Sequence, residues 1–192
     1  MTADPPLRVL VVNSTTREDR FSEIVSPWVR AGLQRRVELE VDTLDLRDHR
    51  LPFFDGPPPA KNPRRYPDDD VRRLAEQVDR ADGYVILAAE YNHGYSAVLK
   101  NALDWTFVEW NRKPVSFVGW GNVGGARAIE QLRLVAVELE MAPLRHAVHV
   151  LGTHMMATRA GETDALAALE PRLELLAEDL AWWGRALRAA RS

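Results

Sequence analysis

The sequence predicts an α/β fold with three layers, in which a doubly wound parallel sheet is covered by helices on both faces. The first observation behind this prediction is that five short apolar runs typical of strands alternate with five segments of helical periodicity. The second is that polar or glycine-rich turns follow several of these strands. Right-handed crossovers would bring these turns together at the carboxyl ends of the strands, where such sheets bind ligands.

Composition fits a single domain over residues 1–192. Of these 192 residues 46% are hydrophobic, which is enough for a packed core. The formal net charge of -3, with basic and acidic residues mixed along the chain, argues against a nucleic-acid-binding protein. The absence of cysteine excludes disulfides and thiolate chemistry. No segment resembles a leader peptide or a membrane span, so we expect a cytoplasmic protein with no membrane partner.

The first expected strand, 7–12, leads into the loop 13–22 and then into a helix with apolar residues from Ile24 to Leu33. The loop contains hydroxyl side chains, two arginines and the free amides of a helix start, which together suit a phosphate group. It matches neither the Walker loop nor the dinucleotide fingerprint. A capped helix with solvated arginines would explain the same residues.

Between residues 37 and 44, apolar and acidic residues alternate, which predicts a half-exposed strand near a sheet edge. The six prolines between residues 45 and 67 exclude a helix or inner strand there. A loop this long is usually functional, so we expect a wall of the ligand site or an arm toward a partner subunit, with a neutral insertion as the alternative. We expect its Phe53 and Phe54 to be covered.

Three consecutive acids, Asp68, Asp69 and Asp70, precede an apolar stripe at helical spacing that begins at Val71. Acidic residues in a first turn are favoured by the helix dipole. We therefore expect a capped helix here and no metal site.

The apolar run 83–88 predicts a strand buried on both faces, and the pattern becomes helical from Ser96. The turn between them contains Glu90, Tyr91, Asn92, His93 and Gly94. Such a turn offers hydrogen-bond donors, acceptors and π-faces to a flat heteroaromatic ligand. An ordinary polar loop is the alternative interpretation.

A fourth expected strand, 113–118, leads into the glycine turn 119–125 and a helix over 126–141. The turn spells Gly-x-Gly-x-x-Gly, the dinucleotide fingerprint. However, it follows the fourth strand instead of the first, and the next expected strand, 144–150, ends without a ribose-binding acid. We therefore expect only a backbone that can approach a ligand closely.

The C-terminal region carries features that we expect to be structural. His146 and His149 are expected on opposite faces of the strand 144–150. We expect these two histidines and His154 to be solvated or structural. A final helix is expected from about residue 171, with Trp182 and Trp183 in core and interface packing.

The chain resembles the NADPH-dependent FMN reductase family over nearly its whole length. In that family the first loop is roughly Gly-Ser-x-Arg-x-x-Arg. The third strand ends in Pro-Glu-Tyr-Asn-His-Gly-Tyr followed by Leu-Lys-Asn-Ala-Leu-Asp-Trp, and the fourth ends in Gly-x-Gly with Gly-Gly close behind. Residues 90–95, 99–105 and 119–125 match closely. Chain length and the first loop also suit a flavodoxin-like, five-stranded parallel sheet of order 2-1-3-4-5.

The resemblance implies which residues hold FMN. Its phosphate would be bound, with nearby amides, by Ser14, Thr16, Arg17, Arg20, Phe21 and Ser22. The isoalloxazine ring would lie against Glu90, Tyr91, Asn92, His93 and Gly94, with Gly121 and Gly124 on the other side. The sequence departs from the family pattern at Asn13 for glycine, at Thr16 as an extra residue, and at Ala89 for proline. The first two departures leave the phosphate contacts open.

The resemblance further implies an oxidoreductase that uses NADPH or NADH. Hydride would pass to FMN and then, in a ping-pong sequence, to a small-molecule electron acceptor such as a flavin or quinone. No catalytic side chain and no metal are required, and family members are homodimers or homotetramers. The alternatives are a flavodoxin-type electron carrier without its own substrate and a flavin-free regulatory module.

Overall fold

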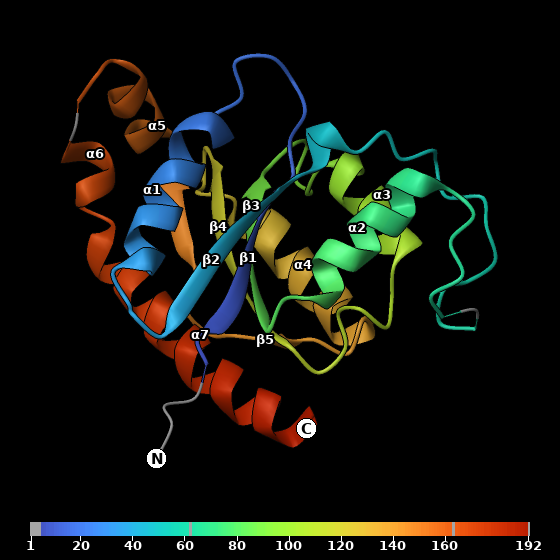
Figure 1. Cartoon of the computed structure of the whole chain (residues 1–192). Coiled ribbons are helices and arrows are strands. Elements are labelled where there is room, and N and C mark those ends of the chain that lie inside the picture. Colours follow the sequence, from blue (N-terminus) through green and yellow to red (C-terminus); the bar gives the residue numbers. More distant parts are fainter. Residues whose placement is uncertain (1–4, 62, 163, 192) are drawn as a thin grey trace.

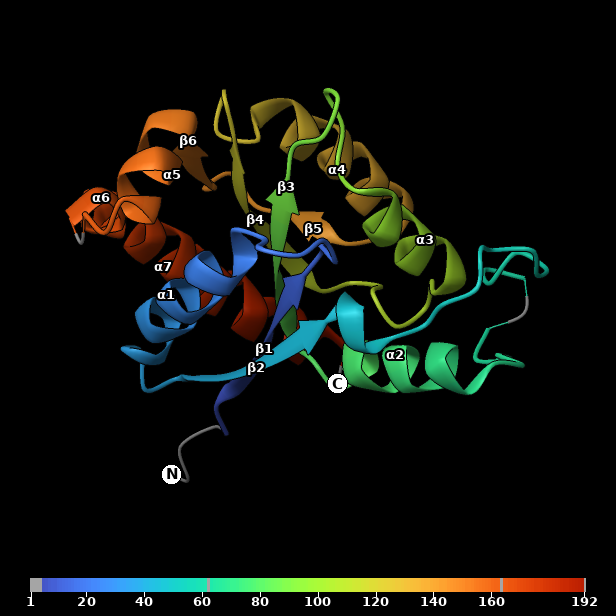
Figure 2. The same cartoon turned by 90° about the horizontal axis from the view of Figure 1, so that it is seen from above.

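A parallel sheet forms the centre of the molecule, with helices on both faces (Figures 1 and 2). The computed structural model describes residues 5–61, 63–162 and 164–191. Its strands run in the order β2 (Leu39–Asp45), β1 (Leu7–Asn13), β3 (Gly83–Ala89) and β4 (Pro114–Gly121), and all neighbours pair in parallel. The predicted flavodoxin-like α/β fold and its strand order are confirmed.

The last position of the sheet differs from the single strand expected over 144–150. Two short strands, β5 (Ala142–Pro143) and β6 (Val148–Leu151), both pair with β4. Between them the hydroxyl of Ser116 donates to the carbonyl of His146, which takes the place of a backbone partner. His146 therefore lies outside the strand, and its ring bonds Asp179 instead.

The sheet has a hydrophobic cluster on each of its two faces, and successive side chains of β1 point alternately into one and the other. Val9 and Val11 pack under α1 (Ser22–Gln34) and α7 (Glu170–Arg191), whereas Leu10 and Val12 face the other side of the sheet. That other side is covered by three helices: α2 (Asp69–Asp79), α3 (Ala97–Trp105) and α4 (Ala126–Glu138). Strand β3 is buried along its whole length, as its uninterrupted apolar sequence predicts.

Two short helices were not expected from the sequence. α5 (Gly152–Arg159) and α6 (Asp164–Ala167) lie between β6 and α7, on the same side as α1 (Figure 1). The pattern gives no signal for α5, because none of its residues is buried and no apolar stripe forms. In addition, α4 ends at Glu138, three residues before the predicted end.

Three aromatic residues depart from the expected burial. Phe54 packs edge-on against Trp105 at 5.0 Å between ring centroids, but Phe53 is 85% exposed, so its expected cover is absent. Trp182 and Trp183 contact each other at the surface of α7, with 59% and 40% exposure, and are not core residues. The prediction that these tryptophans pack in an interface is not tested.

The loop after β2 continues through a short 3-10 helix, Leu46–Asp48, and then lies against α3. The side chains of Asn101 and Trp105 both donate to the carbonyl of Pro52, each at 2.8 Å.

Within the described residues, no helix has the length and apolar character needed to cross a membrane.

The start of α2 gives a test of the capping prediction. The carboxylate of Asp68 accepts hydrogen bonds from the amides of Asp70 and Val71, at 2.8 and 3.1 Å. Asp68→Ala is expected to lower the free energy of unfolding by about 1 kcal/mol, measured by urea denaturation. Asp69 lies in the same first turn but does not accept these two bonds, so Asp69→Ala should lower the free energy of unfolding clearly less. Equal costs would contradict the capping role.

Candidate functional site

A crevice of 430 Å³ lies at the carboxyl ends of the strands. Its walls come from the loop after β1, the ends of β3 and β4, and α5. The loop 14–21 and the turn that begins at Glu90, which the sequence analysis singled out separately, therefore face one space. None of the described residues of the loop 45–67 lines this crevice, so its expected role as a wall finds no support, and the arm toward a partner stays a prediction.

Arg20 is tied into the protein by an ion pair with Asp45 at the end of β2. Both of its terminal nitrogens donate to the Asp45 carboxylate, one of them at 2.7 Å. The same side chain bonds the carbonyl of Thr15 and, at 3.3 Å, the carboxylate of Glu23. The Arg20 side chain is only 6% exposed. Arg20 thus fixes the loop to β2. It also lines the crevice, and its expected phosphate contact stays a prediction.

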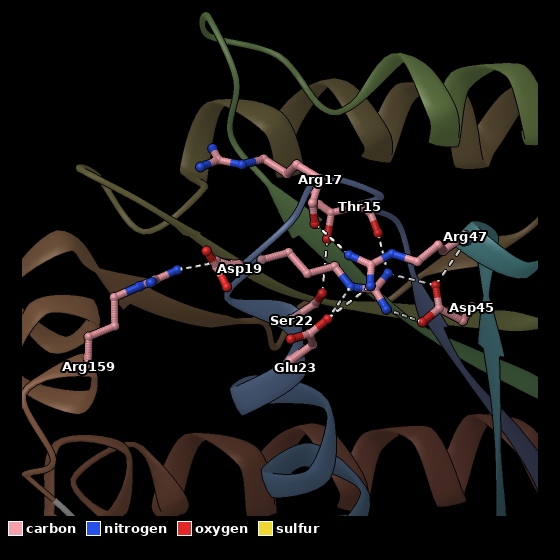
Figure 3. Close-up of polar contacts among 9 residues, drawn as sticks. Thr15, Arg17, Asp19, Ser22, Glu23, Asp45, Arg47 and Arg159 are labelled. Carbon is pink, nitrogen blue, oxygen red and sulfur yellow. Dashed lines mark hydrogen bonds and ion pairs between the residues drawn. The ribbon is translucent and has the colours of Figure 1, made fainter.

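The environment of Asp45 keeps its carboxyl group ionised. Burial alone raises the pKa of Asp45, but hydrogen bonds from the Arg20 side chain and the Arg47 amide outweigh it, so the pKa lies below its ordinary value. Arg47 also donates to the carbonyl of Arg17 and to Glu23, at 3.1 Å for the latter (Figure 3). The network orders the whole first loop.

The hydroxyl groups of this loop are also used internally. Ser14 donates to the carbonyl of Leu87 in β3, and the hydroxyls of Thr15 and Ser22 bond each other at 2.9 Å. Ser14 and Ser22 are fully buried. The structure shows the hydroxyls of these two serines paired within the protein. Their phosphate role stays a prediction.

Other parts of the loop remain available to a ligand. Thr16 and Arg17 are exposed, and in the described part of the chain no hydrogen bond is recorded for the Arg17 guanidinium or for the backbone amides of residues 16–19. Figure 3 shows the Arg17 side chain extending away from Glu23 and Asp45. Phe21 is buried and packs against Trp120, with ring centroids 6.0 Å apart. Free amides beside an unpaired arginine suit an anion.

Arg159 is a crevice residue that the sequence analysis missed. It ends α5 and donates to the carbonyl of Asp19 at 2.7 Å (Figure 3). Its guanidinium carbon lies 5.9 Å from the Phe21 ring centroid. No carboxylate pairs with it among the described residues. Since it lies far from the recognised motifs in sequence, only the fold brings this second cation to the first loop.

The turn after β3 forms the opposite wall. Tyr91 and Gly94 exchange backbone hydrogen bonds of 2.8 and 3.0 Å across Asn92 and His93. Tyr91 lines the crevice, whereas the Asn92 and His93 side chains are exposed beyond it. The carboxylate of Glu90 is buried, and both of its oxygens bond Arg127.

The two predicted glycines have different surroundings. Gly121 lines the crevice with φ of 149°, and a Cβ there would lie 3.2 Å from the Glu90 Cβ. Gly124 has φ of 68° and packs against His149, where a Cβ would come within 2.7 Å of the His149 Cβ. Gly121 therefore lines the crevice, and Gly124 permits the approach of β6; the expected contact of both glycines with FMN stays a prediction.

Residues 7–154 match the model of the NADPH-dependent FMN reductase family. The chain is 33% identical over 135 residues to NAD(P)H-dependent FMN reductase C4B3.06c of Schizosaccharomyces pombe, which covers 70% of this chain and 68% of that protein. It is 38% identical over 142 residues to a 2-hydroxy-1,4-benzoquinone reductase of Burkholderia sp, which covers 70% of this chain and 73% of that protein.

A solved structure with a similar fold is FerB, a flavoenzyme NAD(P)H:(acceptor) oxidoreductase from Paracoccus denitrificans. Its TM-score is 0.74 at 20% identity, over 94% of this chain and 98% of that chain. At this identity the likeness concerns the fold alone.

The Arg20–Asp45 pair predicts a defined pH dependence of stability. Because the folded-state pKa of Asp45 lies below its unfolded value of about 3.9, the pair stabilises the fold fully above about pH 4 and loses its effect as the pH falls through the folded-state pKa. Asp45→Asn should lower the free energy of unfolding by about 3 kcal/mol at pH 7, with a smaller difference at pH 3, in urea titrations.

The matched control is Glu40→Gln. Glu40 lies on β2, like Asp45, and forms an exposed ion pair of 3.6 Å with Arg8 of β1. This substitution should cost under about 1 kcal/mol at either pH. A cost for Asp45→Asn that is equally small, or independent of pH, would contradict the buried role of the pair.

Proposed function

The chain belongs to the NADPH-dependent FMN reductase family, and from this membership we propose that it binds FMN in the crevice and reduces a small acceptor by ping-pong hydride transfer. The family and its relatives make it an NAD(P)H-dependent oxidoreductase of the FMN and quinone reductase type. A flavin or a quinone is the acceptor class that we propose, because the two relatives are an FMN reductase and a 2-hydroxy-1,4-benzoquinone reductase.

The observation that carries the proposal is that one crevice is lined both by a loop with free amides and an unpaired arginine and by the turn that contains Tyr91. The crevice volume of 430 Å³ lies within the usual range of cofactor sites, about 300–1,000 Å³. Arg17, Arg159 and the free amides of residues 16–19 suit the FMN phosphate. Tyr91 and the backbone at Gly121 suit the edge of a flat ring. The donors present therefore fit FMN.

When bound, FMN supplies the hydride-transfer chemistry of the reaction. The protein would hold its phosphate at the first loop and orient the ring against the turn 91–94. Asn92, His93 and Gly94 would contribute through the shape of this turn. We propose no side chain as an essential acid or base. Tyr91 would orient ligands and limit access of water, and His93 would act through the backbone of the turn.

We further propose that the protein is a homodimer or homotetramer in the cytoplasm. Exposed apolar side chains support an assembly, since Leu134 and Val137 on α4 and Trp182 on α7 are each more than half exposed.

The basic test of the proposal is flavin binding followed by turnover. Titration of the purified protein with FMN should quench flavin fluorescence to a saturating end point, and the loaded protein should oxidise NADPH or NADH when benzoquinone is added. Saturable binding without pyridine-nucleotide oxidation would indicate an electron carrier instead. No FMN binding at all would indicate a flavin-free module and would overturn the proposal.

The phosphate assignment has a separate test. Arg17→Ala and Arg159→Ala should each weaken FMN binding by about tenfold, because each loses a charge-assisted contact to phosphate. Riboflavin, which lacks the phosphate, should bind all variants with the same affinity. Arg30→Ala, an exposed arginine on α1, is the control and should bind FMN like the wild type. Equal losses for FMN and riboflavin would contradict the assignment.

A further inference from the structure

Arg127, the second residue of α4, holds the carboxylate of Glu90 from both its backbone and its side chain. The Arg127 amide donates to one Glu90 oxygen at 3.1 Å, and its Nε donates to the other at 2.7 Å, with Nη2 in contact with the same oxygen. The Glu90 side chain is 3% exposed. Burial alone raises the pKa of Glu90, but the bonds from Arg127 outweigh it and leave the pKa below its ordinary value.

The turn that follows Glu90 has a costly backbone conformation. Asn92 and His93 have φ of 49° and 69°, so two consecutive residues with a Cβ occupy the left-handed region. A residue with a Cβ in the left-handed conformation costs about 1 kcal/mol of folding free energy relative to a residue with negative φ, and asparagine costs less. Positive φ at both central residues is the signature of a type I′ turn, for which Asn-Gly is the favoured pair. His93 therefore needs support from its surroundings.

Helix α4 supplies this support at more than one point. Gln131, one turn after Arg127, donates to the carbonyl of His93 at 2.8 Å. Arg127 Nη1 also contacts the His93 ring at Nε2. On the other side, the Glu90 amide donates to the carbonyl of Trp120 at 3.0 Å and so joins the turn to β4. The turn is thus held between α4 and β4.

We propose that Arg127 and Glu90 are positioning residues that hold the Tyr91–Gly94 turn in the conformation required to bind the flavin ring. This inference rests on the proposed function. Glu90 was expected to contact the flavin directly, but both carboxylate oxygens are engaged by Arg127. Its side chain would therefore act on the cofactor through the turn that it anchors.

The test compares variants of the full-length protein by FMN titration, the visible spectrum of the bound flavin and thermal unfolding. Arg127→Ala and Glu90→Gln should each weaken FMN binding by about tenfold and shift the bound-flavin absorption bands. Arg127→Lys keeps the charge but loses the forked geometry, so its FMN affinity should be intermediate. It also serves as the test if the alanine variant does not fold.

The matched control is Arg133→Ala in the same helix. Arg133 donates to the carbonyls of Leu144 and Arg145, away from the crevice, and its side chain is 24% exposed. Its loss should reduce thermal stability but leave FMN affinity and the flavin spectrum unchanged.

A rescue experiment separates positioning from general stability. His93→Gly removes the cost of the left-handed conformation and creates the favoured Asn-Gly pair. The double variant, His93→Gly with Arg127→Ala, should bind FMN at least threefold more tightly than Arg127→Ala alone.

If Arg127→Ala and Glu90→Gln lower only the unfolding temperature, with wild-type FMN affinity and spectrum, the inference is overturned. Failure of the rescue would also count against it. Absence of FMN binding by the wild-type protein would instead refute the proposed function, so the two failures are distinguishable.

Discussion

The parallel hydrogen bonding of β1 to β3 is the constraint on which the site depends. Residues 9–13 pair in register with residues 83–87, so both strands end at the same edge of the sheet. The loop after β1 and the turn after β3 are therefore neighbours, although more than 60 residues separate them in sequence. The buried bond from Ser14 to the carbonyl of Leu87 fixes this contact, and Ser96 reinforces it by donating to the carbonyl of Ser14.

Each wall of the crevice is then fixed by its own ion pair, in which one of the two charged side chains is buried. Arg20 and Asp45 hold the first loop against β2, and Glu90 and Arg127 hold the turn against α4. In both pairs a nearly buried charge is matched by an opposite charge with additional hydrogen bonds, which is the condition under which such burial is tolerated. Consequently the charges of these pairs are neutralised within the protein. Arg17 and Arg159 are left as crevice cations that no carboxylate pairs with among the described residues.

The sequence was sufficient to predict the α/β fold and its strand order, and it singled out the first loop and the turn after β3, which line one crevice in the structure. The apolar runs of β1 and β3, the alternation of apolar and acidic residues in β2, and the polar segments after β1 and β3 carry this information locally. The partners of the charged residues could not be predicted in this way. Nothing near Arg20 or Glu90 in sequence identifies Asp45 or Arg127, because these pairs form only when β2 and α4 pack in place. Arg159 was missed for the same reason, and α5 lacks the apolar stripe that would have predicted a helix.

The most direct measurement is a crystal structure of the protein grown with FMN. The account predicts electron density for the phosphate at the amides of residues 16–19, between Arg17 and Arg159, and for the ring against the Tyr91–Gly94 turn, with the Glu90–Arg127 pair intact. Density for FMN elsewhere on the molecule, or a crevice filled by the protein's own side chains, would contradict it.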